Sequence, residues 1–237
     1  MKRLLKLQKN SSENAVEFHD HLANEWSKKY TSGIFKQRLK LWRAILKKYM
    51  KYEDTWLDAG CGAGDLTKII IEHCAYVIAF DASKKMLQSL NSSPEIDRNR
   101  VTVLSGDIND LSFLNSTQVN GIICSSVMEY LSNVNNALNE FNKTLSPNGT
   151  LIVSIPNKAF NLRYVQVILR RLALNFNFNI FSYLEFSIYC ETKENFVKTL
   201  EMNGFDCVGL YDFKPHRHRF LFNFLAPAIY IYVAVKK

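Results

Sequence analysis

Apolar residues recur along this chain in two patterns, one typical of helices and one typical of buried strands. Residues 13–30 and 35–50 carry apolar side chains at helical spacing, and lysines and arginines occupy the opposite face of the second segment. After them, short continuous apolar runs alternate with further helical segments. We interpret the runs as strands, which begin at residues 55, 76, 101, 121, 150, 205 and 228. Runs of this kind are expected of parallel strands that are buried on both faces.

The alternation of strands and helices with short connections predicts an α/β fold, built on a doubly wound, mostly parallel seven-stranded sheet. The last two runs are separated by a polar loop, which suggests a hairpin at one edge. Residues 1–50 are expected to form an N-terminal helical lid, and residues 157–190 a helical insertion after the fifth strand that covers the substrate. The chain has no internal repeat and no low-complexity linker, so we predict one domain over 1–237.

A glycine-rich turn follows the first predicted strand, with Gly60, Gly62 and Gly64 at alternate positions. Glycines at such a junction let the backbone turn tightly and approach a ligand closely, because they have no Cβ. The spacing differs from the dinucleotide fingerprint G-x-G-x-x-G, and the Gly-Lys-Ser/Thr of a P-loop does not follow. Asp58 ends the strand, where its carboxylate can order the loop or face a cationic ligand group. By itself, the turn indicates only that the backbone comes close to a ligand.

Acidic residues end the next two predicted strands. In doubly wound sheets the ligand lies at the carboxyl ends of the strands, near the point where strand order reverses. Asp81 is placed where a carboxylate can accept hydrogen bonds from both hydroxyls of a ribose. Asp107 is placed to accept a hydrogen bond from an adenine amino group, with the amide of Ile108 beside it, and Met86 can pack on the adenine face. The pattern therefore points to an adenosine-containing ligand.

Five motifs occur in order along the chain: Leu-Asp-Ala-Gly-Cys-Gly-Ala-Gly, Phe-Asp-Ala-Ser-Lys-Lys-Met-Leu, Gly-Asp-Ile, Ser-Ser-Val-Met-Glu-Tyr-Leu and Leu-Ser-Pro-Asn-Gly-Thr-Leu. Together they resemble the class I S-adenosylmethionine (SAM) dependent methyltransferases. The resemblance covers the chain from about residue 18 onward. It implies a Rossmann-like methyltransferase fold, SAM as the cofactor and methyl transfer as the activity.

The resemblance also implies which residues bind the cofactor. These are Asp58, Gly60, Gly62, Gly64, Asp81, Met86, Asp107, Ile108 and Ser125. In this scheme Asp58 and the glycine turn contact the methionyl part of SAM, Asp81 binds the ribose and Ser125 lies under the cofactor. Arg38, or Tyr30, is a candidate partner for the methionine carboxylate.

The subgroup that the chain resembles contains the ubiquinone-biosynthesis O-methyltransferases (methyltransferase type 11/12) and enzymes of polysaccharide and lipid pathways. The quinone enzymes have a Glu-x-x-Glu-His arrangement after the fourth strand, which is linked to a metal. The aligned positions here are Ser126, Glu129 and Tyr130, so two of the three ligand types are missing. We therefore predict no bound metal.

Two residues are candidates for catalysis. His19 lies in the N-terminal helical segment, and a histidine with an ordinary pKa near 6.5 is a natural base for a hydroxyl acceptor. Its alternative role is that of an exposed histidine with no part in the chemistry. Glu129 can act as a general base, or as a carboxylate near a helix N-terminus that is stabilised by the helix dipole.

Composition narrows the cellular setting. The 237 residues carry a formal net charge of +8, which fits an anionic membrane surface, a phosphorylated substrate or nucleic acid. No apolar run reaches the roughly 18 residues of a membrane span. The five cysteines are scattered without CxxC pairs, which favours a reducing compartment, so we expect a cytoplasmic protein.

Residues 158–183 contain four basic residues and no acidic residue, among many aliphatic and aromatic ones. Part of this segment is typical of a basic amphipathic helix, which can lie on an anionic membrane or cover a lipidic substrate. We favour a lid packed on the sheet, with peripheral membrane-surface contact as the alternative. Nucleic acid is not favoured, because the sequence contains no recognised binding module.

These observations predict a SAM-dependent methyltransferase that acts on a small-molecule or lipid-linked acceptor. Oxygen is the expected acceptor atom, and direct in-line displacement is the expected reaction, with the protein supplying position and a base. The alternative is a SAM-binding protein without methyltransferase activity, either a regulatory partner or a protein with altered SAM chemistry.

Overall fold

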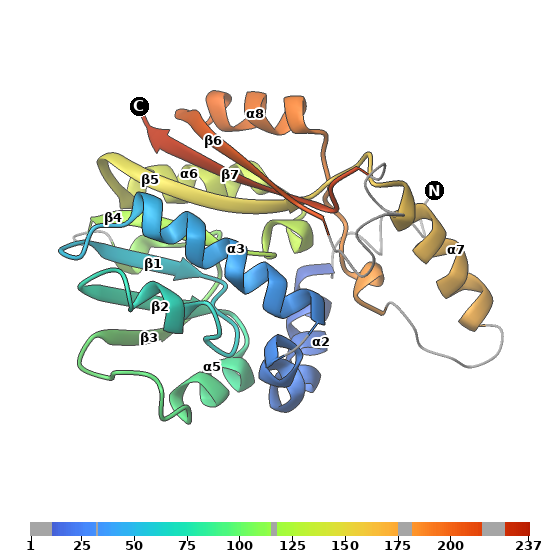
Figure 1. Ribbon diagram of the computed structural model, residues 1–237, viewed down its shortest axis with the longest axis horizontal. Coiled ribbons are helices and arrows are strands. Elements are labelled where there is room, and N and C mark those ends of the chain that lie inside the picture. The colour runs from blue at the N-terminus through green and yellow to red at the C-terminus, as the bar shows by residue number, and fades with distance from the viewer. Residues whose placement is uncertain (1–10, 32, 115–117, 175–181, 215–225) are drawn as a thin grey trace.

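The computed structural model describes residues 11–31, 33–114, 118–174, 182–214 and 226–237. Its centre is one seven-stranded sheet with the order β3-β2-β1-β4-β5-β7-β6 (Figure 1). The strands are β1 (Thr55–Ala59), β2 (Tyr76–Asp81), β3 (Val101–Ser105), β4 (Val119–Cys124), β5 (Leu145–Pro156), β6 (Phe205–Phe213) and β7 (Ile229–Lys236). The first five pair in parallel, and β7 is antiparallel to both β5 and β6. The predicted doubly wound, mostly parallel sheet is confirmed.

Helices cover both faces of this sheet (Figure 1). The α-helices are α2 (Ser11–Trp26), α3 (Gly33–Tyr49), α4 (Thr67–Ile70), α5 (Lys84–Asn91), α6 (Val134–Thr144), α7 (Asn161–Leu174) and α8 (Lys193–Met202). The 3₁₀ turns are η1 (Ser27–Thr31), η2 (Ser112–Leu114), η3 (Met128–Tyr130) and η4 (Ser182–Glu185). Of these, α3, α4 and α5 pack in one hydrophobic cluster, and α6 and α8 pack in another.

Neighbouring residues of the inner strands belong to opposite clusters. Trp56 of β1 joins the cluster under α3, while Leu57 joins the one under α6. Ile122 and Ile123 of β4 divide in the same way, and all four side chains are at most 1% exposed. Successive side chains on a strand point to opposite faces. Continuous apolar runs are therefore required wherever both faces are covered, which explains the sequence pattern.

The strand order reverses between β1 and β4, because the chain first builds β2 and β3 on one side of β1 and then returns to the other side. The carboxyl ends of β1, β2 and β4 meet at this point, which is where ligands bind in doubly wound sheets. Helices α2 and α7 lie beyond these strand ends, and α7 projects from the body of the molecule (Figure 1). Among the described residues, no helix is both long enough and apolar enough to cross a membrane.

Gly121 of β4 is required by close packing against its neighbour in β1. A Cβ at this position would lie 2.4 Å from ring atoms of Trp56, which is itself 1% exposed. Trp56 pairs with Gly121 in register, so neither strand can move aside without breaking the ladder.

We expect Gly121→Ala to lower the free energy of unfolding by about 1–3 kcal/mol, because the added methyl overpacks the core. Urea denaturation followed by tryptophan fluorescence measures this change. Gly209→Ala in β6 is the matched control, since its Cβ would meet the hydroxyl tip of the Tyr49 side chain at 2.7 Å, where the side chain can move. Equal stability of the Gly121→Ala variant and the parent would contradict the packing argument.

Candidate active site

A cavity of about 850 Å³ opens at the carboxyl ends of the parallel strands. Its walls come from α2, the N-terminal turn of α3, the glycine turn after β1, the ends of β2 and β3, and the loop after β4. The insertion that contains α7 and η4 closes the other end of the same cavity. The site is therefore assembled from segments that lie far apart in the sequence.

The cavity brings together all but one of the predicted site residues. Those that line it are His19, Arg38, Asp58, Gly60, Gly62, Asp81, Met86, Asp107, Ile108, Ser125 and Glu129. Gly64 is the exception. Its φ is +84°, and a Cβ there would lie 2.8 Å from Leu90 of α5, so this glycine permits helix packing rather than ligand approach.

Asp81 connects the glycine turn to the end of β2. Its Oδ2 accepts a hydrogen bond from the amide of Gly62 at 2.8 Å, and its Oδ1 accepts one from the amide of Ser83 at 2.8 Å. Burial raises the pKa of this carboxyl, while the two amide hydrogen bonds act against that shift. An ionised carboxylate has about four acceptor sites, so each oxygen retains capacity for a ligand hydroxyl. This geometry suits the predicted contact with a ribose.

Asp58 carries a buried carboxylate with one oxygen still to be satisfied. The hydroxyl of Thr67 donates to its Oδ2 at 2.6 Å, whereas Oδ1 has no hydrogen-bond partner among the described residues. Asp58 is 1% exposed, and burial raises its pKa from 3.8 to about 7. A buried acceptor without a partner costs free energy, which a donor from a ligand can recover. The ammonium of an amino acid fits this requirement.

Arg38 places a fixed cation at the end of β4. It reaches from α3 into the cavity, where its Nη2 donates to the hydroxyls of Ser125 and Ser126 at 2.7 Å each. Ser126 has a φ of +57°, a left-handed conformation that turns its hydroxyl toward the same guanidinium. The side chain of Arg38 is 8% exposed. An oriented guanidinium of this kind fits a carboxylate.

The part of the cavity where adenine is predicted to bind is more apolar. Met86 and Ile108 are buried and face it, and Met86 packs in a small cluster with Ala23, Ala63 and Trp26. Asp107 is exposed, and its Oδ1 accepts from the amide and the side chain of Asn109 at 2.9 Å. The cavity thus has apolar walls for an adenine ring, with a carboxylate at its edge.

The two candidate catalytic residues lie in different surroundings. His19 shares a 2.7 Å hydrogen bond between its Nδ1 and the carbonyl of Ala15, and its ring packs edge-on against Trp26 and Tyr130. Its charge also acts on Asp81, so it lies on the cofactor side of the cavity. Glu129 is buried, and its Oε2 accepts from the hydroxyl of Ser187 at 2.6 Å. Both catalytic assignments stay predictions.

Residues of the insertion were not predicted as site residues, although they line the cavity. They include Phe160, Arg163, Gln166, Ser182 and Tyr183. The sequence signalled this segment only by its charge and apolar content, which carry no position-specific motif. Among the described residues, no three His, Cys, Asp or Glu side chains gather as a metal site requires, and the predicted absence of a metal stays a prediction.

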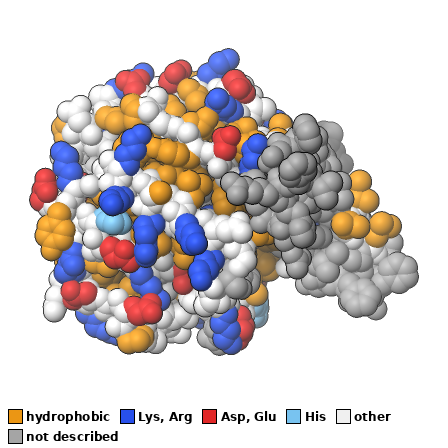
Figure 2. Space-filling view, in the orientation of Figure 1, with side chains coloured by type: hydrophobic (Ala, Val, Ile, Leu, Met, Phe, Trp, Pro, Cys, Tyr) orange, Lys and Arg blue, Asp and Glu red, His pale blue; other side chains and the backbone are white. Residues whose placement is uncertain are grey.

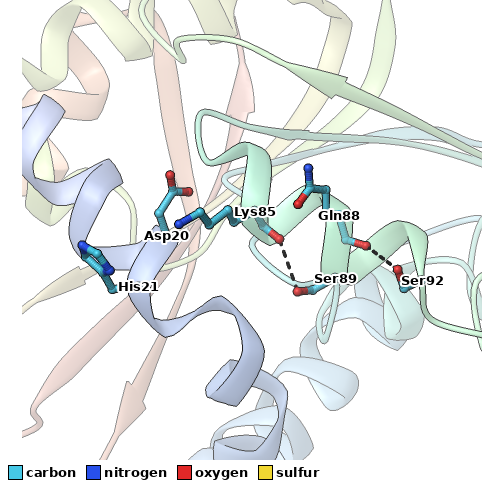
Figure 3. A pocket seen from close by; sticks show the side chains of 6 residues that line it. All are labelled: Asp20, His21, Lys85, Gln88, Ser89 and Ser92. Carbon is cyan, nitrogen blue, oxygen red and sulfur yellow. Dashed lines mark hydrogen bonds between the residues drawn. The ribbon is translucent and has the colours of Figure 1, made fainter.

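A second, polar pocket of about 550 Å³ lies between α2 and α5, lined by Asp20, His21, Lys85, Gln88, Ser89 and Ser92. Lys85 extends from α5 toward Asp20 on α2 (Figure 3). Asp20 also accepts a 2.5 Å hydrogen bond from the hydroxyl of Ser83, the residue that caps α5. These contacts between α2 and α5 hold α2 over one side of the main cavity, where the cofactor is predicted to bind.

Comparison with known proteins shows what the central segment matches and which structures the fold resembles. Residues 57–153 match a family model described as a methyltransferase domain. A curated uncharacterized methyltransferase of Schizosaccharomyces pombe is 25% identical over 105 residues, which are 41% of this chain and 37% of that protein. The matched segment therefore spans little more than a third of this relative's length.

Solved structures resemble nearly the whole chain. The magnesium protoporphyrin IX methyltransferase ChlM of Synechocystis, with S-adenosylhomocysteine (SAH) bound, has a TM-score of 0.68 at 16% identity, covering 94% of this chain and 100% of that one. The N-methyltransferase NodS of Bradyrhizobium japonicum, also with SAH bound, has a TM-score of 0.66 at 14% identity. The match covers 96% of this chain and 98% of that one. A methyltransferase of Haloferax volcanii in complex with its Trm112 activator has a TM-score of 0.66 at 14% identity. The match covers 92% of this chain and 97% of that one. At these identities the likeness concerns the fold.

The fold is that of the class I SAM-dependent methyltransferases, and residues 57–153 match a methyltransferase domain. Two solved structures of this fold hold SAH, the demethylated form of S-adenosylmethionine. The residues present fit that cofactor, because Asp58 lacks a partner for one buried oxygen among the described residues and Arg38 supplies a fixed cation. The closer resemblance to the quinone O-methyltransferases stays a prediction.

We expect SAH to bind about tenfold more weakly at pH 6 than at pH 8, because only the ionised form of Asp58 attracts its ammonium and the pKa is about 7. Calorimetric titration across this range measures the change. Asp58→Asn should bind weakly and with little dependence on pH. A variant that kept the parent's pH profile would show that another group is responsible.

Proposed function

We propose that this protein transfers the methyl group of SAM to a small-molecule or lipid-linked acceptor, at oxygen in preference to carbon or nitrogen. The observation that carries the proposal is the continuity of one cavity, which joins the cofactor residues to the insertion. A methyl donor and an acceptor must meet in one space, with the reacting atoms about 3–3.5 Å apart. When bound, SAM supplies an activated methyl group, so the chain itself needs to provide position more than chemical activation.

The protein's own residues orient the donor and exclude water. Asp58 and Arg38 suit the ammonium and the carboxylate of one amino acid, which would fix the methionyl end. Asp81 would fix the ribose. Helix α2 covers the cavity through Ala15, His19 and Trp26, two of which make the aromatic contacts described above. For a hydroxyl acceptor, His19 is the proposed base, because it lies on this covering helix beside Tyr130.

The acceptor end of the cavity combines apolar walls with polar side chains of the insertion, among them Arg163 and Gln166. Phe18, Phe160, Phe213 and Ile229 line it, and the hydroxyl of Tyr183 donates to Gln166 at 3.2 Å nearby. Sites of this composition take ligands with a largely apolar body and a small number of polar atoms. This supports a phenolic, quinone-like or lipid-linked acceptor. The fold does not select the acceptor atom, since NodS is an N-methyltransferase on the same fold.

The alternative function is SAM binding without methyl transfer. Both hypotheses require cofactor binding, and only the enzyme releases SAH in the presence of an acceptor. A screen of hydroxylated, quinone and glycolipid acceptors that follows SAH release separates them.

We expect Asp81→Ala to weaken SAH binding about a hundredfold, because two charge-assisted hydrogen bonds to the ribose would be lost. Asp206→Ala is the control, since this exposed carboxylate of β6 forms a surface ion pair with Lys237 at 3.2 Å. Circular dichroism checks that both variants fold. SAH affinity retained in Asp81→Ala would rule out the cofactor assignment of this residue.

We also propose that the insertion contacts a membrane surface. On α7, Ile168, Leu169 and Leu172 are 56%, 45% and 54% exposed, and Figure 2 shows hydrophobic side chains on the side where α7 projects. The described cations nearby are engaged, since Lys158 pairs with Glu191 and Arg170 pairs with Glu185. Apolar contact rather than charge would therefore dominate. Residues 175–181 of this segment lie outside the described residues.

Replacing Ile168, Leu169 and Leu172 together by Gln should abolish cosedimentation with vesicles, because the apolar face is lost. The parent should bind phosphatidylcholine vesicles about as well as vesicles that also contain phosphatidylglycerol. Met202→Gln is the control, because Met202 is 87% exposed on α8. A parent protein that binds neither kind of vesicle would remove the membrane proposal and leave the insertion as a lid.

A further inference from the structure

Arg163 presents a guanidinium at the acceptor end of the main cavity. It belongs to the first turn of α7 and lines the cavity. Its Nη2 donates to the carbonyl and to the hydroxyl of Ser187, at 2.9 Å each. That hydroxyl in turn donates to Oε2 of Glu129 at 2.6 Å. The guanidinium is therefore held on one side by the chain that returns from the insertion.

The segment that holds Arg163 is itself fixed. The backbone carbonyl of Glu129 accepts from the amides of Ile188 and Tyr189, at 2.8 Å and 3.0 Å. Ser187 and Glu129 are 7% and 8% exposed. Both acceptors of Nη2 thus belong to a buried segment that is tied to η3. A cation held in this way is oriented before a ligand arrives, which reduces the entropy that binding costs.

Most of the hydrogen-bonding capacity of Arg163 is unused. A guanidinium has five N–H donors, of which Nη2 carries two. The three on Nε and Nη1 form no hydrogen bond with any residue that the structure describes. Within that part of the chain Arg163 also has no ion pair. The other two insertion cations whose side chains are described do have one, since Lys158 pairs with Glu191 and Arg170 pairs with Glu185.

Glu129 does not take up the charge of Arg163 by direct contact. The hydroxyl of Ser187 stands between the carboxylate and the guanidinium, and it accepts from one and donates to the other. Burial raises the pKa of Glu129, while the Ser187 hydrogen bond and the charge of Arg163 act against that shift. The two groups therefore interact through one hydroxyl, which leaves Nε and Nη1 for a ligand.

The surroundings of Arg163 suit an anionic head group on an apolar body. Gln166, one turn further along α7, lines the same cavity, and its Oε1 accepts from the hydroxyl of Tyr183 at 3.2 Å. The amide N–H groups of Gln166 are then the part of this side chain that remains to donate. Phe160 lines the cavity beside them and is 8% exposed. Carboxylates and phosphates are the groups that a guanidinium binds most specifically.

We propose that Arg163 selects acceptors that carry a carboxylate or a phosphate, by binding this anion at the acceptor end of the cavity. The apolar body of the acceptor would then extend along the phenylalanine side chains toward the cofactor residues. This inference rests on the proposed methyl transfer, because it names the substrate class for that function. Arg163 is a specificity-determining residue and takes no part in the displacement itself.

Three probes with one apolar body and different head groups test the proposal: 2-naphthoate, its neutral amide 2-naphthamide, and 2-naphthyl phosphate. Each is titrated calorimetrically into the full chain with SAH at saturating concentration, so that anions are kept from the predicted methionyl site. Arg163→Gln removes the charge, and Arg163→Lys keeps it. Arg170→Gln is the matched control, because it removes one positive charge from the same helix at a residue that pairs with Glu185 and lies outside the lining of the cavity.

We expect the parent to bind at least one of the two anions about tenfold more tightly than 2-naphthamide, as for the gain of a charge-assisted hydrogen bond. In Arg163→Gln this ratio should fall to about one, while Arg163→Lys and Arg170→Gln should keep it within about threefold. A variant that only disturbs packing weakens charged and neutral probes alike, so the ratio isolates the charge. The tighter of the two anions identifies the head group.

Three results would overturn the proposal: equal affinity of the parent for charged and neutral probes, binding of none of the probes, or an anion preference that persists in Arg163→Gln. Should circular dichroism show that Arg163→Gln does not fold, the parent is treated with the arginine reagent phenylglyoxal and the modified residues are read by mass spectrometry. Both anions should then protect Arg163 more than 2-naphthamide does. Equal modification of Arg163 with and without the anions would contradict its role.

The proposed function is tested separately, by SAH release from SAM. Turnover of neutral acceptors with no preference for anionic ones would retain methyl transfer and refute the role of Arg163. An anion preference in binding that depends on Arg163, without turnover of any acceptor, would retain the anion site and refute methyl transfer.

Discussion

The hydrogen bonds of Asp81 fix the glycine turn, and the rest of the site depends on that turn. One carboxylate accepts from Gly62 in the turn and from Ser83 at the N-cap of α5, so the ends of two strands and the cap of a helix are held by the same side chain. Gly62 has a φ of +55°, and a Cβ at this position would lie no closer than 3.7 Å to Trp26, which leaves the backbone open to a ligand. Ser83 in turn donates to Asp20, which brings α2 over the cavity. This side of the cavity is therefore ordered by residues that also line it.

The ionised form of Asp58, which would attract a cationic ligand group, is also the form that destabilises the folded protein. Its folded pKa of about 7 lies above the ordinary value of 3.8, so between these pH values the folded protein holds a proton that the unfolded chain has lost. The contribution of this group to stability therefore falls as the pH rises through that window. At neutral pH the unliganded protein bears the cost of a buried, half-satisfied carboxylate. A cationic ligand group would relieve that cost, which links occupancy of the site to the stability of the fold.

The fold could be predicted from the sequence because its strands are buried on both faces. That constraint forces continuous apolar runs, and the runs at 76–80 and 150–155 fall inside β2 and β5. The acids at the strand ends could be predicted because topology brings the carboxyl ends of neighbouring parallel strands together. The motif alone could not separate the role of Gly64 from those of Gly60 and Gly62, since packing against Leu90 and ligand approach both require glycine and leave the same sequence signal.

Other features depend on contacts that no local pattern encodes. The segment after the glycine turn has helical spacing, yet only Thr67–Ile70 form an α-helix. Strand β5 begins at Leu145, because this residue pairs with Val119 before the turn at Ser146 to Gly149. Ser187 bonds to Glu129 across 58 residues and to Arg163 across 24. Serine and arginine are common in loops, so only the folded structure reveals that they meet.

The position of β7 has a consequence for how the protein is made. Residues 229–236 lie between β5 and β6, both of which precede them in the chain. During synthesis, β1 to β5 can assemble as each crossover helix emerges, but β6 has no neighbour to pair with until β7 has left the ribosome. In that interval Phe205 and Phe213, which are both buried in the complete sheet, have not yet reached their buried positions. The seventh strand thus acts as the closing step of the fold, and a ribosome that stalls within it would leave a sheet with an unpaired apolar edge.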